Sequence, residues 1–317
     1  MSRLNICMYH YIRDLCHSRY PEIKGLDVRL FRKQCLFFKE NFKVVRMEQV
    51  IEAVKGGTTL PENALLLTFD DGYVDNYTYA LPILEEFGFQ GSFFIPGKTF
   101  TTHQLLDVNK IHYILASADI NKLIQDLFER MNFYRGKEYD FPSNQELFEE
   151  YALANRFDGK ETVFVKRILQ NVLPESLRNQ ISSDLFEKYV GVSEELLAYE
   201  LYMTSDQIMT MKRHGMYIGV HGYDHYWLGK LPKEKMEEDI TKALEVMNEF
   251  IDNKEWVMNY PYGSYNTDVI SFIREQGACL GLTTNVRVAD LMHDSKYELP
   301  RLDCNDFPPK SEKYKTI

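Results

Sequence analysis

The chain has 317 residues, of which 44% are apolar and 14% aromatic, and its formal net charge is −10. A chain of this length and composition can bury a large core, which excludes intrinsic disorder. The acidic balance, without any run rich in lysine and arginine, excludes nucleic acid as the expected partner, because a polyanion is repelled on average.

The N-terminal segment is expected to form a strand and not a secretion signal. Residues 1–10 pass directly into a strand-like run, without the charged start and long apolar stretch of a signal peptide. No stretch approaches the roughly 18–20 apolar residues that cross a bilayer, so no transmembrane segment is expected. The five scattered cysteines suit buried thiols in a reducing compartment. We therefore expect a cytoplasmic protein, with peripheral binding to a membrane left open.

Short β-rich runs alternate with amphipathic helical stretches along the chain. The sequence predicts strands at 4–8, 64–69, 91–95, 216–220, 256–259 and 279–284. It predicts core-facing helices at 28–40, 76–87, 233–251 and 267–275, where apolar residues recur at spacings of three and four. This alternation indicates an α/β fold, a distorted or incomplete (β/α) barrel, with a doubly wound open sheet as the alternative.

One region interrupts the alternation. Residues 105–211 contain only helical patterns, and capping-box sequences at 143–146 and 204–207 mark two helix starts. We therefore expect a single catalytic domain over 1–317, with a helical insertion at 105–211 whose role the sequence leaves open.

Two adjacent carboxylates, Asp70 and Asp71, come directly after the first long apolar strand and before a glycine. Successive residues at a strand end point in different directions, so one carboxylate can bind a metal while its neighbour faces a bound water. That division of labour suits hydrolysis. The alternative is a turn between strand and helix, in which the aspartates cap the following helix.

A pair of histidines, His221 and His225, follows a second apolar strand. At a spacing of four residues the two imidazoles are close enough to share one ion. With one aspartate they make three ligands and leave a coordination position for water, as catalytic sites do. Because barrel strands converge at one edge, we expect Asp71 and His221 to meet. An ordinary surface pair of histidines is the alternative.

A tight turn follows the strand at 256–259. Pro261 and Gly263 fix this turn, whose backbone N–H groups can point at a developing oxyanion, and Tyr262 is the expected donor. A plain connection between a strand and a helix is the alternative.

In this order, the three motifs resemble those of the polysaccharide deacetylase family (NodB homology domain, carbohydrate esterase family 4). They read Thr-Phe-Asp-Asp-Gly at 68–72, His-Gly-Tyr-Asp-His at 221–225 and Asn-Tyr-Pro-Tyr-Gly at 259–263. The resemblance covers about 4–100 and 215–306 and leaves the helical insertion unaccounted for.

The resemblance implies a role for each motif residue. Asp70 would be the general base, Asp71, His221 and His225 the metal ligands, and the Tyr262 N–H an oxyanion donor. It implies a hydrolase that removes N-acetyl or similar acyl groups from an amino-sugar substrate, either a surface glycan or a sugar intermediate. Mixed nitrogen and oxygen ligands suit Zn²⁺ best, while Co²⁺, Ni²⁺ or Mn²⁺ can take the same ligands.

The sequence departs from the family pattern at several positions. Gly222 replaces a serine or threonine, and Asn259 stands where the third motif usually has arginine. We expect Arg301, near the end of the chain, to hold Asp70 in its place, with a surface arginine as the alternative.

The general acid is the least determined part of the expected site, because the family's fourth motif is not recognisable. His10, at the end of the first strand, and His293, in a Leu-Met-His sequence, are both candidates. A satisfied core histidine is the alternative for His10.

Two other functions remain open from the sequence. One is a metal-independent amide or imide hydrolase on the same fold, against which the retained histidines and aspartates argue. The other is a non-catalytic carbohydrate-binding protein, which the missing arginine and the unassigned acid allow. The sequence does not determine the oligomeric state.

Overall fold

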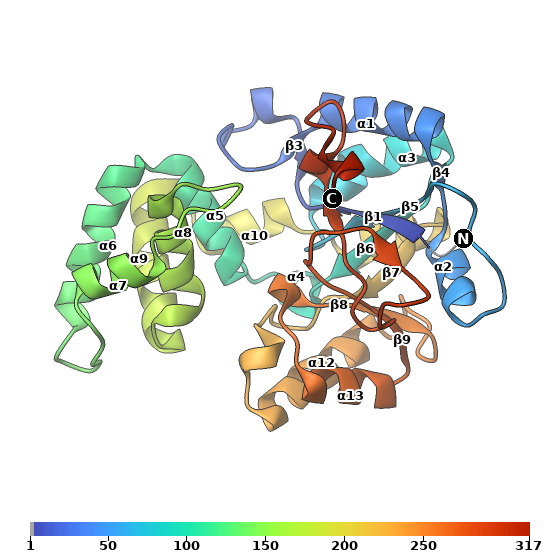
Figure 1. Cartoon of the computed structure of the whole chain (residues 1–317). Helices are drawn as coiled ribbons and strands as arrows, with labels where there is room; N and C mark the ends of the chain where they lie inside the picture. The colour runs from blue at the N-terminus through green and yellow to red at the C-terminus, as the bar shows by residue number, and fades with distance from the viewer. Residues whose placement is uncertain (1–2) are drawn as a thin grey trace. The chain divides into compact units, whose positions relative to one another are not determined.

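The computed structural model describes residues 3–317, which divide into two compact units. The first contains residues up to 14, 25–103 and 200–317; the second contains 15–24 and 104–199. The helical insertion expected at 105–211 overlaps the second unit, whose main segment ends at residue 199 and which also includes a short N-terminal segment. Figure 1 shows the strands in the first of these units.

A curved, mostly parallel sheet forms the first unit. Its main strands are β1 (Arg3–Tyr9), β5 (Ala64–Phe69), β6 (Gly91–Ile95), β7 (Tyr217–Val220), β8 (Trp256–Asn259) and β9 (Ala278–Leu282). The strand order is β10-β1-β5-β6-β7-β8-β9, where β10 (Ala289–Asp290) is antiparallel to β1. Two short strands pair beside this path: β4 (Lys43–Val44) with β5, and β11 (Leu302–Asp303) with β1. Within residues 3–317 the end strands β10 and β9 do not pair, which confirms the predicted incomplete barrel.

Alternate residues of the strands enter two different cores, as the period of two in a strand requires. Leu65 and Leu67 of β5 pack in the larger core, which contains Phe31 and other apolar residues of the helices. Leu66 joins a smaller core on the opposite face of the sheet. The strand is buried on both faces, which explains its unbroken apolar sequence.

The predicted amphipathic stretches correspond to α1 (Val28–Asn41), α3 (Leu81–Phe87), α12 (Lys233–Met247) and α13 (Thr267–Glu275) in the first unit. This unit also contains α2 (Met47–Val54) and α4 (Gly97–Thr101), which were not predicted, and α11 (Ser205–Arg213), which lies within the expected insertion. The predicted helix at 233–251 ends earlier, at Met247, where the chain turns toward β8. The predicted capping box at Thr204 is present at the start of α11.

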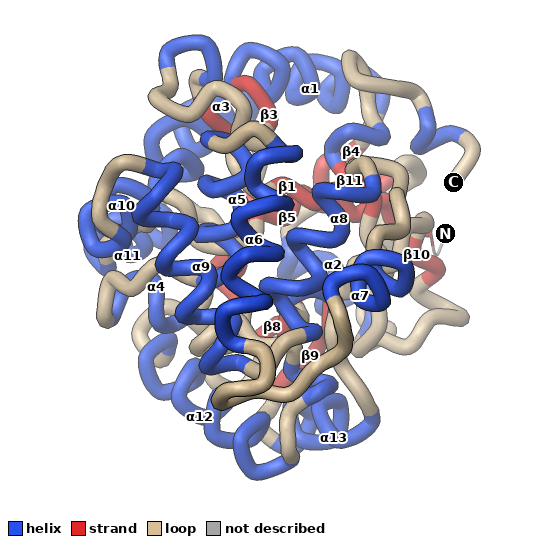
Figure 2. The backbone as a smooth tube through the Cα atoms, turned by 90° about the vertical axis from the view of Figure 1, so that its left-hand side faces the viewer, coloured by secondary structure: helices blue, strands red, loops and turns tan. Residues whose placement is uncertain are grey.

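The second unit is a helical bundle. Its helices are α5 (Asp107–Ser117), α6 (Ile120–Tyr134), α7 (Asn144–Tyr151), α8 (Lys160–Arg167), α9 (Glu175–Val190) and most of α10 (Glu194–Leu201). In this bundle α5 packs on α9, and α6 packs on both α8 and α9 (Figure 2). Buried residues four apart, such as Leu123 and Leu127, supply its core. Across residues 3–317, no helix has both the length and the apolar composition needed to cross a bilayer.

Candidate active site

The predicted site residues meet at the carboxyl ends of the parallel strands. Asp70 and Asp71 follow β5, His221 follows β7, and Asn259 ends β8. The strand order brings these ends to one edge of the sheet, although the residues lie far apart in the sequence. Asp70, Asp71, His221 and His225 are all buried, so their charges and polar atoms depend on one another.

Asp71 and the two histidines form a compact cluster of metal-ligand atoms. The Asp71 Oδ1 atom lies 3.3 Å from His221 Nε2 and 3.3 Å from His225 Nε2. Ligand atoms of the three residues all lie within 4.8 Å of one another. The structure therefore brings together the three residues that the sequence predicted as ligands.

The polar atoms of this cluster fit a bound cation. Asp71 Oδ1 is buried and has no hydrogen-bond partner within residues 3–317. An unpaired buried carboxylate oxygen is costly, and a positive ion between it and two imidazole nitrogens would remove that cost. Burial opposes ionisation of Asp71, but the facing imidazoles of His221 and His225 hold its pKa well below the ordinary value. Burial lowers the pKa of His225, which favours the neutral form that binds metals.

Contacts behind the cluster orient two of its members. The Tyr73 hydroxyl donates to Asp71 Oδ2 at 2.6 Å, which leaves Oδ1 facing the histidines. His221 Nδ1 lies 2.6 Å from the Asn259 carbonyl oxygen, a hydrogen bond that turns Nε2 toward Asp71. Tyr73 was not singled out from the sequence, although it directly follows the Asp-Asp-Gly motif.

Arg301 holds the second carboxylate. Its Nη1 and Nη2 atoms donate to Asp70 Oδ1 and Oδ2, each at 2.8 Å, in a bidentate pair. The buried guanidinium also donates from Nε to the Thr283 carbonyl at 2.8 Å and from Nη1 to Thr68 Oγ1 at 3.2 Å. Burial opposes ionisation of Asp70, but the charges of Arg301 and His10 and the hydrogen bonds from Arg301 together outweigh it and lower the pKa of Asp70. The predicted contact between these two residues is present.

The two candidate acids lie in different places. His10 Nε2 is 3.8 Å from Asp70 Oδ2, and its side chain is 39% exposed, so it can reach a substrate. His293 is 78% exposed and bonds to Asp290, whose strand pairs with Arg3 at the start of β1. His10 follows the other end of β1, so the structure does not bring His293 to the site. The geometry therefore favours His10 over His293 as the candidate acid.

Three site residues have a strained backbone. Asp71, His225 and Tyr262 have φ values of 72°, 59° and 58°, in the left-handed region that non-glycine residues rarely adopt. Such a residue costs about 1–3 kcal/mol and persists only where its surroundings fix it, which is typical of functional sites. The Tyr262 ring packs between His225 and Trp227, at centroid distances of 4.7 and 4.5 Å.

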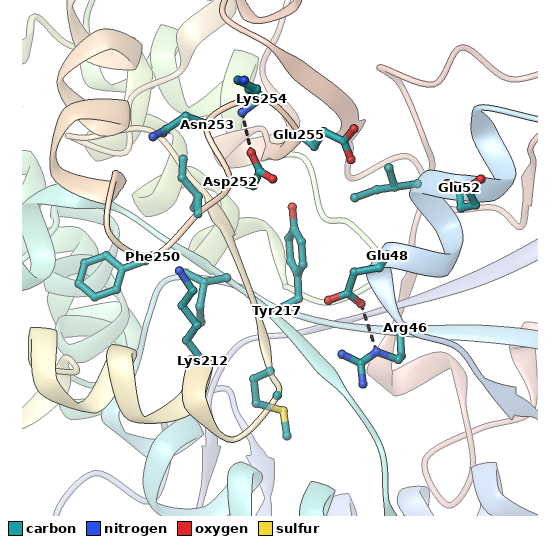
Figure 3. A pocket seen from close by; sticks show the side chains of 15 residues that line it. Arg46, Glu48, Glu52, Lys212, Tyr217, Phe250, Asp252, Asn253, Lys254 and Glu255 are labelled. Carbon is teal, nitrogen blue, oxygen red and sulfur yellow. Dashed lines mark hydrogen bonds and ion pairs between the residues drawn. The ribbon is translucent and has the colours of Figure 1, made fainter. Parts of the chain in front are cut away.

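A cavity of about 970 Å³ lies at the other ends of the strands, before β7 and β8 (Figure 3). Tyr217 projects into it, and charged residues that include Arg46, Lys212 and Glu255 surround it. It contains none of the predicted site residues.

Comparisons with known proteins agree with the motifs. A family model described as "Polysaccharide deacetylase" matches residues 57–132 and 159–280, more than half of the chain. The poly-beta-1,6-N-acetyl-D-glucosamine N-deacetylase of Escherichia coli (strain K12) is 47% identical over 81 residues, which are 25% of this chain. The matched segment spans only 12% of that relative's length.

Two solved structures share the fold. The Streptococcus pyogenes deacetylase PplD, solved in complex with acetate, has 16% identity and a TM-score of 0.58, over 99% of this chain and 96% of that one. IcaB from Ammonifex degensii has 18% identity and a TM-score of 0.57, over 100% of this chain and 98% of that one. At these identities the likeness concerns the fold alone.

Proposed function

Because this chain belongs to the polysaccharide deacetylase family, we propose that it is a hydrolase that removes N-acetyl or similar acyl groups from an amino-sugar substrate. The main support is that two sets of residues lie together at the carboxyl ends of the parallel strands. One set is the buried cluster of Asp71, His221 and His225, and the other is the ion pair of Asp70 with Arg301. The first suits metal binding and the second suits proton transfer.

The proposal includes a divalent metal ion held by Asp71, His221 and His225. Its support is the buried Asp71 Oδ1 atom, which has no hydrogen-bond partner within residues 3–317 and faces two imidazole nitrogens. These nitrogen and oxygen donors suit Zn²⁺, and they also accept Co²⁺, Ni²⁺ or Mn²⁺. When bound, such an ion polarises the amide carbonyl and lowers the pKa of a coordinated water.

The chain's own residues then move the protons. Asp70, oriented by Arg301, accepts a proton from the attacking water as its oxygen bonds to the amide carbon. The backbone N–H of Tyr262 donates to the oxyanion that forms. The C–N bond breaks as His10, which lies 3.8 Å from Asp70, gives a proton to the leaving amine. The products are the free amino sugar and acetate.

The relative with 47% identity over 81 residues suggests the first substrate to test. Its name specifies poly-beta-1,6-N-acetyl-D-glucosamine, so β-1,6-linked oligomers of N-acetylglucosamine lead the panel. Nucleotide-linked and lipid-linked N-acetylhexosamines complete it, because they carry the same amide on a sugar intermediate. The substrate from which acetate is released fastest shows whether the enzyme acts on a polymer or on a sugar intermediate.

The test combines acetate release with elemental analysis of the full chain. We expect near-stoichiometric metal in the wild type, loss of metal and activity in His221→Ala, and retained metal without activity in Asp70→Asn. A positioned general base contributes about 10²- to 10⁴-fold, so Asp70→Asn should lose at least that much. His293→Ala, exposed and remote from Asp70, is the control and should keep both metal and activity.

Other outcomes identify the alternatives. Acetate release that survives complete removal of metal would indicate a metal-independent amide hydrolase. Binding of the oligomers without any acetate release, by metal-loaded protein, would indicate a carbohydrate-binding protein and contradict the proposal.

A further inference from the structure

We infer that Asp239, on α12, is a positioning residue that fixes the loop between the two histidines. This loop, residues 222–224, is called the ligand loop below. The inference rests on the proposed metal site and adds a residue to it from a helix that carries none of the recognised motifs.

Both oxygens of Asp239 bind the backbone of the ligand loop. Tyr223 N donates to Asp239 Oδ2 at 3.0 Å, and Asp224 N donates to Oδ1 at 2.8 Å. Asp239 is 5% exposed, so water competes little with these bonds. Charge-assisted hydrogen bonds in a buried setting are among the stronger interactions that a loop backbone can make.

The opposite side of the loop is held by the backbone of α4. Gly97 N donates to the Gly222 carbonyl, and Lys98 N donates to the Tyr223 carbonyl, each at 3.0 Å. The ligand loop is therefore bound on both sides. Of these four hydrogen bonds, the two to Asp239 involve a side chain, so a substitution can remove them. Lys98 also pairs with Asp224 of the loop at 2.9 Å, but both of these side chains are about one-quarter exposed.

The two histidines depend on this loop to different extents. The ring of His221 has its own anchor, the hydrogen bond between Nδ1 and the Asn259 carbonyl. His225 Nδ1 is buried and has no hydrogen-bond partner in residues 3–317. Its backbone is also strained, with φ at 59°. The direction of the His225 ring is consequently set by the ligand loop, by packing against Tyr262 and by the facing Asp71. Asp239 and the backbone of α4 together hold the loop.

Gly222 and Asp239 are matched in shape. Gly222 has a φ of 69°, and a Cβ built on it would lie 2.9 Å from Asp239 Oδ2. A larger residue at 222 would therefore push against the carboxylate that holds the next two N–H groups. The glycine at this position, a departure from the family motif, leaves the space that Asp239 occupies.

Burial has a cost for this carboxylate. Removal from water raises the pKa of Asp239 to about 6, although the two backbone N–H groups of the loop oppose that shift. Asp224 raises the pKa further and Lys242 lowers it. Because burial disfavours the charged form of Asp239, its place here is better explained by the ligand loop that it orients than by a contribution to stability.

The test is Co²⁺ binding by the metal-free full chain, followed by its visible absorption and by competition with a chelator. The Co²⁺ spectrum depends on the number and arrangement of its ligands. We expect Asp239→Asn to weaken Co²⁺ binding by about 10- to 100-fold, the usual effect of losing a residue that orients a ligand. We also expect an altered spectrum. Glu238→Gln, exposed on the same helix, is the control and should change neither.

A second pair of variants tests the same contact from the loop. Gly222→Ala and Gly88→Ala both place a side chain at a φ of 69°, but no atom lies within 4 Å of the new Cβ at Gly88. Both should lower the thermal midpoint of the metal-free protein through backbone strain. Only Gly222→Ala should also weaken Co²⁺ binding and change its spectrum. This pair decides the question if Asp239→Asn fails to fold.

The outcomes separate this inference from the proposed function. If folded Asp239→Asn binds Co²⁺ with the affinity and spectrum of the wild type, the inference is overturned and the metal site stands. If both glycine variants behave alike toward Co²⁺, the inference is equally overturned. If the wild type binds neither Co²⁺ nor Zn²⁺, the proposed metal site fails and the inference fails with it.

Discussion

The two ends of the parallel strands β5, β7 and β8 both carry polar residues, but the residues are in different physical states. At the carboxyl ends, Asp71 and His225 are buried, their backbones are strained, and Asp71 Oδ1 lacks a hydrogen bond within residues 3–317. At the amino ends, the cavity is surrounded by charged residues such as Arg46, whose ion pair with Glu48 is more than half exposed. The cavity at the amino ends is large, but the charged residues around it are exposed. The motif residues at the carboxyl ends are buried, and Asp71 Oδ1 among them has no hydrogen-bond partner within residues 3–317.

This difference has a physical reason. Exposed ion pairs contribute about 0–1 kcal/mol, so charges around an open cavity can be kept, lost or exchanged at little cost. Buried charges and strained residues persist only when their surroundings hold them. Buried charged groups and strained residues that lie together therefore mark the candidate site better than the size of a cavity does.

The largest expected effect comes from replacing an arginine at the carboxyl ends of the strands, compared with an arginine at their amino ends. Arg301→Met removes the bidentate partner of Asp70 and leaves a buried carboxylate unpaired, which should destabilise the fold by about 3–5 kcal/mol. Arg46→Met breaks only an exposed pair and should change stability by less than about 1 kcal/mol. Urea unfolding of both proteins measures the difference. Equal losses of stability in the two variants would show that burial does not distinguish the two ends of the strands.

A smaller effect is expected from Tyr73→Phe, which removes the hydroxyl that donates to Asp71 Oδ2. Without this bond Asp71 is freer to turn, so metal affinity should fall by about tenfold or more. Chelator competition measures it. Tyr297→Phe is the matched control, because its buried hydroxyl donates to the Ala278 carbonyl, away from the cluster. A Tyr73→Phe protein that keeps full metal affinity would mean that the two histidines orient Asp71 without help.

The smallest effect is expected at the cavity. Glu255→Gln removes the charge that pairs with Lys55, and both side chains are nearly half exposed. Stability should change by less than about 0.5 kcal/mol, and acetate release should stay at the wild-type rate. The comparable change at the other end, Asp70→Asn, is expected to abolish acetate release. A several-fold loss of activity in Glu255→Gln would indicate that the cavity has a function, and it would contradict the difference between the two ends of the strands.

Local patterns in the sequence were sufficient for much of the fold. The apolar run that becomes β5 is buried on both faces, so its composition was sufficient to identify it as a strand. Helix starts with a capping box, such as that at Thr204, were readable because the signal lies within four residues. The end of α12 was placed too late, because a helix end depends on where the chain must turn toward β8.

The candidate site divides in the same way. The sequence by itself singled out Asp70, Asp71, His221 and His225 as candidates, because each lies after a strand within a short motif. The sequence offered Arg301 as the partner of Asp70 with a surface arginine as the alternative, and the tertiary structure decided between them. Only the tertiary structure placed His293 away from Asp70 and brought Tyr73 and Asp239 to the ligand side chains and their loop. Residues that bind a metal belong to recognisable local patterns, because the chemistry fixes their type and spacing. Residues that orient them are ordinary tyrosines and aspartates, whose role comes only from where the folded chain brings them.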